Sequence, residues 1–579
     1  MRKVKLNESA KLLLLSLLVG LCSGGAAVVL EKAIDLIQNL VHSAADKTPL
    51  HFAYIVFPAA GMLISLLLVR FVIKDNIGHG VTKVLLAISR NESRIKPHNT
   101  WSSMLTSAIT IGFGGSVGAE APIVYTGAAF GSNLGRTFRL SNRGITVLLG
   151  CGAAGAIAGI FKAPLAGVLF TLEILLFNIS MSSIMPLLLS TLTATVVAFI
   201  FQGSSAPFSS ALAPFMMENL PFYLILGVFC GIFSLYFTHL TLWLEEWFGK
   251  HLRSRYIRWM VCAGGLGLLI FLFPPLFGEG YDSLEQLLGG GEPSLRTATP
   301  FGALMDSAWS IPLFFLLVLL LKVVTMTLTN SGGGVGGTFG PTLFEGAVLG
   351  FIVARTLNLC GVDIPEQNFV LVGMAGLMAG VMQAPMTAIF LIAEITGGYQ
   401  LLLPLILCAT VSYGVTRTRE KYSIYTKRIA QSGDLLTHDN DQAVLTLLHT
   451  RDLIRDKYPH ISEHATLSDI SSTVAESTVA VFPVLDEEGR FQGMLEMDDI
   501  RKHIFEQDSL NRFRVEDLMH SPPEYIYEDE KMDSVMRKFD KTAAWRLPVI
   551  TEDGLYLGFI SRSRLLTAYR KELKQLTED

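Results

Sequence analysis

Long apolar segments recur up to about residue 420, and they constrain the fold more than any other feature of the sequence. They cover residues 12–30, 52–69, 220–243, 258–275, 308–321 and 400–412. A helix needs about 20 apolar residues to cross a hydrocarbon core about 30 Å thick, and several segments have that length. Charged residues make up 17% of the chain, compared with about 25% in soluble proteins. We therefore predict an all-α, polytopic membrane domain over residues 1–430.

The basic N-terminus could be mistaken for a secretory signal. Its apolar run continues from Leu12 to Leu30 without a clear cleavage site, so we interpret it as a retained membrane helix. The residues Arg2 and Lys3 before it predict a cytoplasmic N-terminus. The six cysteines show no CxxC spacing, and the net charge is −4. We therefore expect no metal site and no nucleic-acid partner.

Beyond residue 430, charged residues and short alternating segments replace the long apolar ones, which predicts a soluble α+β region over residues 431–579. Residues 479–500 and 546–565 share the pattern strand, turn, strand, helix. The turns contain Gly489 and Gly554, each after an acidic residue, as expected for hairpins. We predict two related modules, at about 440–508 and 515–575.

The membrane part contains an internal repeat. Residues 151–174 align without gaps on residues 372–395, with nine of 24 positions identical, including Pro164 with Pro385 and Glu173 with Glu394. The repeat predicts two related halves, at about 50–200 and 260–418, and leaves open whether they are parallel or inverted. Transport folds often bind their substrate between two such halves. We interpret Glu173 and Glu394 as structural carboxylates that bind helix ends or lie at a dimer interface.

Glycine-rich breaks precede a helix in each half, at residues 114–118 and 332–337. Such runs cannot continue a stable helix, and exposed backbone at membrane depth is tolerated where it lines a cavity. Free N–H groups at helix N-termini, with the positive end of the helix dipole behind them, favour an anion. Two such termini predict an anion site. The alternative is that the glycines only allow close helix packing.

Four short motifs carry a resemblance to a known family. They are Gly-His-Gly-Val-Thr at 78–82, Gly-Ala-Glu-Ala-Pro at 118–122, Gly-Thr-Phe-Gly-Pro at 337–341 and Tyr425 within Ser-Ile-Tyr-Thr at 423–426. In this order they resemble the CLC family of chloride channels and chloride/proton antiporters. The resemblance implies an integral membrane homodimer with one chloride pathway in each subunit.

The resemblance also implies roles for particular residues. Glu120 would be the gating glutamate, whose carboxylate occupies the anion site and leaves it when protonated. A carboxylate among membrane segments is expensive and usually functional. The remaining anion-binding positions would be His79, Gly118, Ala119, Ala121, Thr338, Phe339 and Tyr425.

Three positions depart from the family pattern. His79 replaces a serine whose hydroxyl contacts the anion, and Ala119 replaces an arginine before the gating glutamate. Ile174 replaces the second glutamate of a pair, which relays protons from inside in the bacterial exchangers. Isoleucine cannot carry a proton, so the sequence favours passive chloride conduction. A proton-coupled antiporter with another proton route is the alternative.

Two other classes of function are disfavoured. An enzyme would need a catalytic motif beside Glu120 or His79, and the sequence contains no HExxH. Residues 114–118 match GxSxG in letters, but they form the glycine-rich break between apolar segments and do not follow a strand, as a nucleophile motif would. A cation transporter would need more polar side chains in its membrane segments.

The soluble tail resembles a pair of CBS domains, which implies a regulatory role and adenine-nucleotide binding. Of the usual nucleotide signature, the first module keeps Asp499 and the second keeps Ser561, and neither is complete. A structural, dimer-stabilising tail is therefore favoured over a nucleotide site. We expect both termini to be cytoplasmic and the host membrane to be a bacterial plasma membrane.

Overall fold

The computed structural model divides the chain into two compact units, Met1–Asp434 and Leu435–Asp579. It describes residues 8–45, 53–90, 92–175, 181–203, 212–289, 301, 307–432, 448–455, 458–501, 503 and 513–577.

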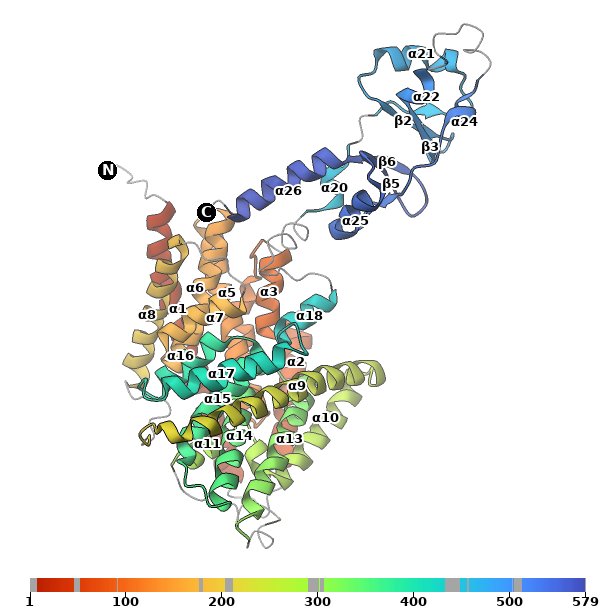
Figure 1. Cartoon of the computed structure of the whole chain (residues 1–579). Helices are drawn as coiled ribbons and strands as arrows, with labels where there is room; N and C mark the ends of the chain where they lie inside the picture. The colour runs from red at the N-terminus through yellow and green to blue at the C-terminus, as the bar shows by residue number, and fades with distance from the viewer. Residues whose placement is uncertain are drawn as a thin grey trace, which may run out of the picture. The chain divides into compact units, whose positions relative to one another are not determined.

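The first unit is built from helices alone in the part that the structure describes (Figure 1). Its first half contains α1 (Glu8–Ala45), α2 (Ala53–Leu67), the π-helix η1 (Leu68–Ile73), α3 (Gly80–Arg90), η2 (Pro97–Thr100), α4 (Ser102–Gly112), α5 (Glu120–Thr137), α6 (Asn142–Phe161), α7 (Pro164–Ile174) and α8 (Met181–Gln202). Its second half contains η3 (Met217–Asn219), α9 (Leu220–His251), α10 (Arg255–Leu272), η4 (Pro274–Leu276), α11 (Tyr281–Leu288), α13 (Ser310–Ser331), α14 (Phe339–Leu359), α15 (Glu366–Met382), α16 (Pro385–Ile395), α17 (Leu402–Arg417) and α18 (Ile424–Ser432).

Eight of the described helices are long and apolar enough to cross a membrane. Many of their large apolar side chains are exposed, such as Ile200 at 70% and Phe201 at 60%, as expected for surfaces that face lipid. The prediction of a polytopic helical membrane domain is confirmed.

The two halves repeat the same packing. Helices α5 and α6 approach so closely that a Cβ on Gly127 would lie 2.1 Å from the carbonyl oxygen of Gly152. The repeat-related α14 and α15 do the same, since a Cβ on Gly346 would lie 2.5 Å from the carbonyl oxygen of Gly373. Small residues at both crossings bring the backbones into contact, as is typical of membrane helix packing.

The halves have opposite orientations. The repeat-related α7 and α16 run antiparallel, because the C-terminal part of each binds the N-terminus of the other through Glu173 and Glu394. The repeat seen in the sequence is therefore inverted, which the sequence alone left open.

The second unit contains two copies of one α+β module. The first has β1 (Ile461–Ser462), α21 (Leu467–Glu476), β2 (Val481–Leu485), β3 (Phe491–Glu496) and α22 (Met497–Arg501). The second has β4 (Ile526–Tyr527), α25 (Met532–Thr542), β5 (Arg546–Ile550), β6 (Tyr556–Ser561) and α26 (Arg562–Thr577). The short helices α20 (Thr450–Leu453) and α24 (Val515–Leu518) precede the modules.

Each module has a three-stranded sheet, ordered β1-β2-β3 or β4-β5-β6. The first pair of strands is parallel and the second pair is antiparallel. The hairpins that the sequence predicted are β2–β3 and β5–β6, and each buries its own apolar core around Phe482 or Leu547. The predicted α+β tail is confirmed.

Candidate functional site

The glycine-rich breaks of the two halves meet inside the first unit. The backbone N–H of Gly118 donates to the carbonyl of Gly337 at 3.0 Å, and the N–H of Gly337 donates back to Gly118 at 2.7 Å. This short antiparallel bridge joins the segments that lead into α5 and α14. Two helix N-termini, one from each half, therefore begin side by side, as the anion-site prediction requires.

Glu120 is the first residue of α5, and its carboxylate binds the start of the other helix. Oε2 accepts a hydrogen bond from the backbone N–H of Gly340 on α14 at 3.1 Å. Oε1 accepts one from the hydroxyl of Tyr281 at 2.9 Å. Only 2% of Glu120 is exposed. The carboxylate thus occupies a helix N-terminus where a free anion could otherwise bind.

A second carboxylate, Glu279, lies at the start of α5 itself. Its Oε1 accepts a hydrogen bond from the backbone N–H of Ala119 at 2.8 Å. Glu279 lies two residues before Tyr281, the first residue of α11. The buried ammonium of Lys322 on α13 donates to the carbonyl of Gly278, directly before Glu279, at 2.8 Å. Sequence reasoning missed these three residues. A glutamate between two glycines, directly after an apolar segment, was the signal that could have drawn attention to them.

Tyr425 lies next to the start of α14, on α18. The hydroxyl of Thr338 donates to the Tyr425 hydroxyl at 3.3 Å, which in turn lies 3.3 Å from the sulfur of Met382. Phe339 follows Thr338 as the first residue of α14, and both are buried. Ala121 is buried in the first turn of α5. The structure therefore gathers Gly118, Ala119, Glu120, Ala121, Thr338, Phe339 and Tyr425 around the two helix starts.

His79 faces a different group of residues. Its Nε2 lies 3.8 Å from a carboxylate oxygen of Glu245, and 34% of its side chain is exposed. It lines a cavity of about 380 Å³ with Lys427 and Arg428 of α18, the helix that carries Tyr425. Among the described residues, no hydrogen bond or ion pair joins His79 to Glu120 or Tyr425. A direct contact between His79 and the anion stays a prediction.

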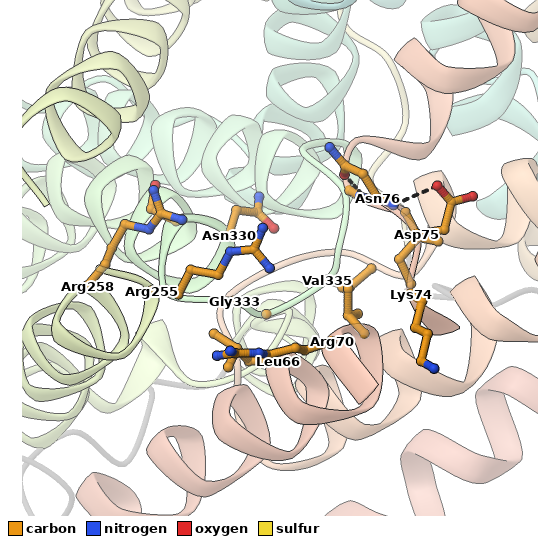
Figure 2. A pocket seen from close by; sticks show the side chains of 15 residues that line it. Leu66, Arg70, Lys74, Asp75, Asn76, Arg255, Arg258, Asn330, Gly333 and Val335 are labelled. Carbon is orange, nitrogen blue, oxygen red and sulfur yellow. Dashed lines mark hydrogen bonds between the residues drawn. The ribbon is translucent and has the colours of Figure 1, made fainter. Parts of the chain in front are cut away.

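A second, more positive cavity of about 590 Å³ is lined in part by residues 74–78, directly before His79. Figure 2 shows Arg70, Arg255, Arg258 and Asn330 among the side chains that line it. The excess of positive charge around this cavity favours anions in it.

Glu173 and Glu394 bind helix ends, as we interpreted them from the sequence. The carboxylate of Glu173 accepts from the backbone N–H groups of Met386 and Thr387 at the start of α16, at 3.0 and 2.7 Å. The carboxylate of Glu394 accepts from Leu165 and Ala166 at the start of α7, at 3.0 and 2.9 Å. Ile174 follows Glu173 as the last residue of α7 and is 3% exposed. No carboxylate stands at the position of the internal relay.

Comparison with known families identifies the chain. The family model described as voltage gated chloride channel matches residues 60–417, more than half of the 579 residues. The chain belongs to the voltage-gated chloride channel family. Members of this family are membrane anion transporters, so the enzyme alternative is excluded. The CBS domain model matches residues 451–506 and 515–571 of the second unit.

Relatives of this chloride channel family member include exchangers. The H(+)/Cl(-) exchange transporter ClcA of Salmonella paratyphi B is 29% identical over 417 residues, which cover 68% of this chain and 83% of the relative. The protein of the same name from Vibrio cholerae is 28% identical over 418 residues, which cover 68% and 84%.

Solved structures share the fold. A slow cyanobacterial Cl-/H+ antiporter superposes with a TM-score of 0.63 at 21% identity, covering 73% of this chain and 98% of that one. A eukaryotic CLC transporter superposes with a TM-score of 0.61 at 18% identity, covering 96% and 98%. At these identities the likeness establishes the fold alone.

In the CBS modules, the two residues of the nucleotide signature already have partners. The carboxylate of Asp499 accepts from the backbone N–H of Glu496 at 3.0 Å and lies 3.3 Å from Nδ1 of His520. The hydroxyl of Ser561 accepts from the backbone N–H of Arg564 at 3.3 Å. In both cases a side-chain oxygen accepts a backbone N–H at the start of a helix, as is typical of helix capping.

Proposed function

We propose that this protein exchanges chloride for protons across the membrane, with Glu120 as the gate and proton carrier. The proposal rests on the hydrogen bond that the Glu120 carboxylate accepts from the backbone N–H of Gly340. Through this bond a titratable group occupies the anion site that we propose. The exchangers named ClcA, at 28–29% identity, support coupling. This reverses the order that Ile174 alone favoured in the sequence.

The proposed mechanism follows from competition for one site. When charged, the Glu120 carboxylate is held by Gly340 and Tyr281 and keeps the anion out. Protonation removes its negative charge and weakens both hydrogen bonds, since bonds to charged groups are about twice as strong as neutral ones. The freed N–H groups at the start of α14 then bind chloride, with the Thr338 and Tyr425 hydroxyls at its other side. Return of the charged carboxylate expels chloride and completes the cycle.

Protons must reach Glu120 without the usual internal relay. Ile174 is buried and cannot titrate, and Glu173 beside it is held by the start of α16. We therefore propose a route through water from the side of Tyr425, and we place the His79 imidazole at its entrance, in the cavity lined by Lys427 and Arg428.

The test is chloride efflux from proteoliposomes that hold the purified protein, with external pH recorded while valinomycin clamps the voltage. We expect chloride loss with stoichiometric proton uptake, and we expect Glu120→Ala to abolish the proton movement. Chloride loss without proton movement in the unmodified protein would contradict exchange. It would establish the second candidate, passive chloride conduction, which Ile174 favours.

The assembly and setting follow from the same resemblance. We propose a homodimer with one pathway in each subunit, in a bacterial plasma membrane, with both termini cytoplasmic. The CBS pair would then stabilise or regulate the dimer from the cytoplasmic side, and we favour the structural role over adenine-nucleotide binding.

A further inference from the structure

Two helix N-termini meet at the site, and a carboxylate binds each of them. Glu120 accepts the backbone N–H of Gly340 at the start of α14. Glu279 accepts the backbone N–H of Ala119 at the start of α5. Ala119 is one of the positions at which the family resemblance places anion contacts. Glu279 therefore covers a donor that an anion in the site would use, as Glu120 covers the other.

The segment that carries Glu279 also holds Glu120 in place. Tyr281, two residues after Glu279, donates its hydroxyl to Oε1 of Glu120. Gly280 between them has a φ of +93°, and a Cβ there would lie 2.6 Å from the ring of Phe344 on α14. Lys322 anchors the other end of the segment at Gly278. A displacement of residues 278–281 would thus release both carboxylates together.

The two carboxylates differ in their exposure to solvent. Glu120 is almost fully buried, whereas Glu279 is only half-buried and so lies nearer the surface. The segment leads into α11, which lies in the lower part of the first unit in Figure 1, below α18. Glu279 therefore lies on the side of Glu120 that Tyr281 occupies.

The surrounding charges disfavour an ordinary structural ion pair. Glu279 interacts electrostatically with Glu120, Lys322 and Glu31, which gives two like charges and one opposite charge. Lys322 donates its hydrogen bond to a backbone carbonyl, and no salt bridge among the described residues joins it to Glu279. A carboxylate held beside another carboxylate by a single backbone N–H is one that a chloride ion can displace.

We propose that Glu279 is a second gating carboxylate, which occupies the N-terminus of α5 as Glu120 occupies that of α14. A chloride-sized anion then enters or leaves on this side only when both carboxylates have moved. This inference rests on the proposed function, since it assigns a further residue to the same anion site.

The test measures chloride binding to the full-length, detergent-purified protein by isothermal titration calorimetry. Glu279→Gln keeps the shape of the side chain and removes its negative charge, so we expect chloride to bind about tenfold more tightly, with faster chloride efflux from proteoliposomes. Glu279→Asp keeps the charge and should restore weaker binding. Asp282→Asn, which removes an exposed carboxyl three residues after Glu279, should change neither quantity.

Unchanged chloride affinity and efflux in a folded Glu279→Gln protein, while Glu120→Gln binds chloride more tightly, would overturn this inference and leave the proposed function standing. If Glu279→Gln fails to fold, Glu279→Ala takes its place, and an unchanged chloride affinity in folded Glu279→Ala would also overturn it. No chloride binding by any form, Glu120→Gln included, would overturn the proposed function and this inference with it.

Discussion

Among single residues, Tyr281 holds the Glu120 carboxylate that we propose as the gate. Its hydroxyl donates to Glu120 at 2.9 Å, in addition to the backbone N–H of Gly340. A hydrogen bond to a charged group contributes about 1.5–3 kcal/mol, which corresponds to a tenfold or larger change in an equilibrium. We therefore expect Tyr281→Phe to raise the chloride efflux rate by about tenfold, provided that release of the carboxylate limits the rate.

The matched control for this substitution is Tyr399→Phe, which removes a hydroxyl from a tyrosine that is 52% exposed. It should leave efflux unchanged. A Tyr281→Phe protein with unaltered efflux and unaltered proton coupling would mean that the hydroxyl does not hold Glu120 in the closed state.

Among the helices, α7 and α16 are locked by reciprocal contacts. Each carboxylate, Glu173 or Glu394, binds two backbone N–H groups that the opposite helix cannot satisfy within itself. A glutamine keeps only one acceptor oxygen and no charge, so at least one of the two N–H donors loses its partner and the other is bound less strongly, at a cost of about 1–3 kcal/mol. We expect Glu394→Gln and Glu173→Gln each to lower the melting temperature of the purified protein, measured by tryptophan fluorescence, without changing proton coupling.

An exposed glutamate provides the comparison. Glu246→Gln breaks only a surface ion pair with Lys250 and should leave the melting temperature almost unchanged, because exposed pairs contribute little. Loss of proton coupling in folded Glu173→Gln would show instead that Glu173 carries protons in place of the missing relay at Ile174.

The second module offers a pH-dependent contact outside the membrane. Burial alone would raise the pKa of Glu530, but hydrogen bonds from Lys538, Ser534 and the backbone of Tyr527 outweigh burial and lower the pKa below its ordinary value of 4.5. This contact stabilises the folded module fully above pH 4.5, and the stabilisation is lost as pH falls through the lower, folded-state pKa.

We therefore expect Lys538→Met to weaken hydrogen-exchange protection of β4 and α25 near neutral pH. The difference from the unmodified protein should shrink as the pH falls below 4.5. Glu552→Gln, at an exposed carboxyl of the same module, is the control. A difference in protection that does not depend on pH would show that Lys538 acts through packing of its side chain rather than through Glu530.

The elements that the sequence predicted best were those that occur twice. The repeat and the proline-preceded helix starts located α5 and α14, and hence Glu120 beside Gly340, although 220 residues separate them. Glu279 could not be located in this way, because its segment has no counterpart in the other half and no motif. The inverted orientation was also out of reach, since identical residues align equally well in parallel and inverted repeats. It became visible only through the reciprocal contacts of Glu173 and Glu394.

For the whole molecule, the contacts of Asp499 and Ser561 disfavour a nucleotide signal from the CBS pair to the transport unit. Asp499 already accepts the backbone N–H of Glu496 and lies near His520, so a ribose would have to displace these contacts. Ser561 is likewise engaged by the backbone of Arg564, and Arg564 stands where a nucleotide-binding module carries aspartate. Neither module offers the free hydroxyl and carboxylate together that ribose recognition requires.

We therefore expect millimolar ATP, ADP or AMP to leave chloride efflux from proteoliposomes unchanged when it is present at the face that carries the CBS pair. Asp499→Ala should lower the stability of the first module, because it removes the acceptor at the start of α22, and should leave efflux in the presence or absence of nucleotide the same. A change in efflux on adding nucleotide to the unmodified protein, absent in Asp499→Ala, would contradict this expectation. It would mean that the contacts of Asp499 exchange for ribose and that the tail is a sensor rather than a structural support.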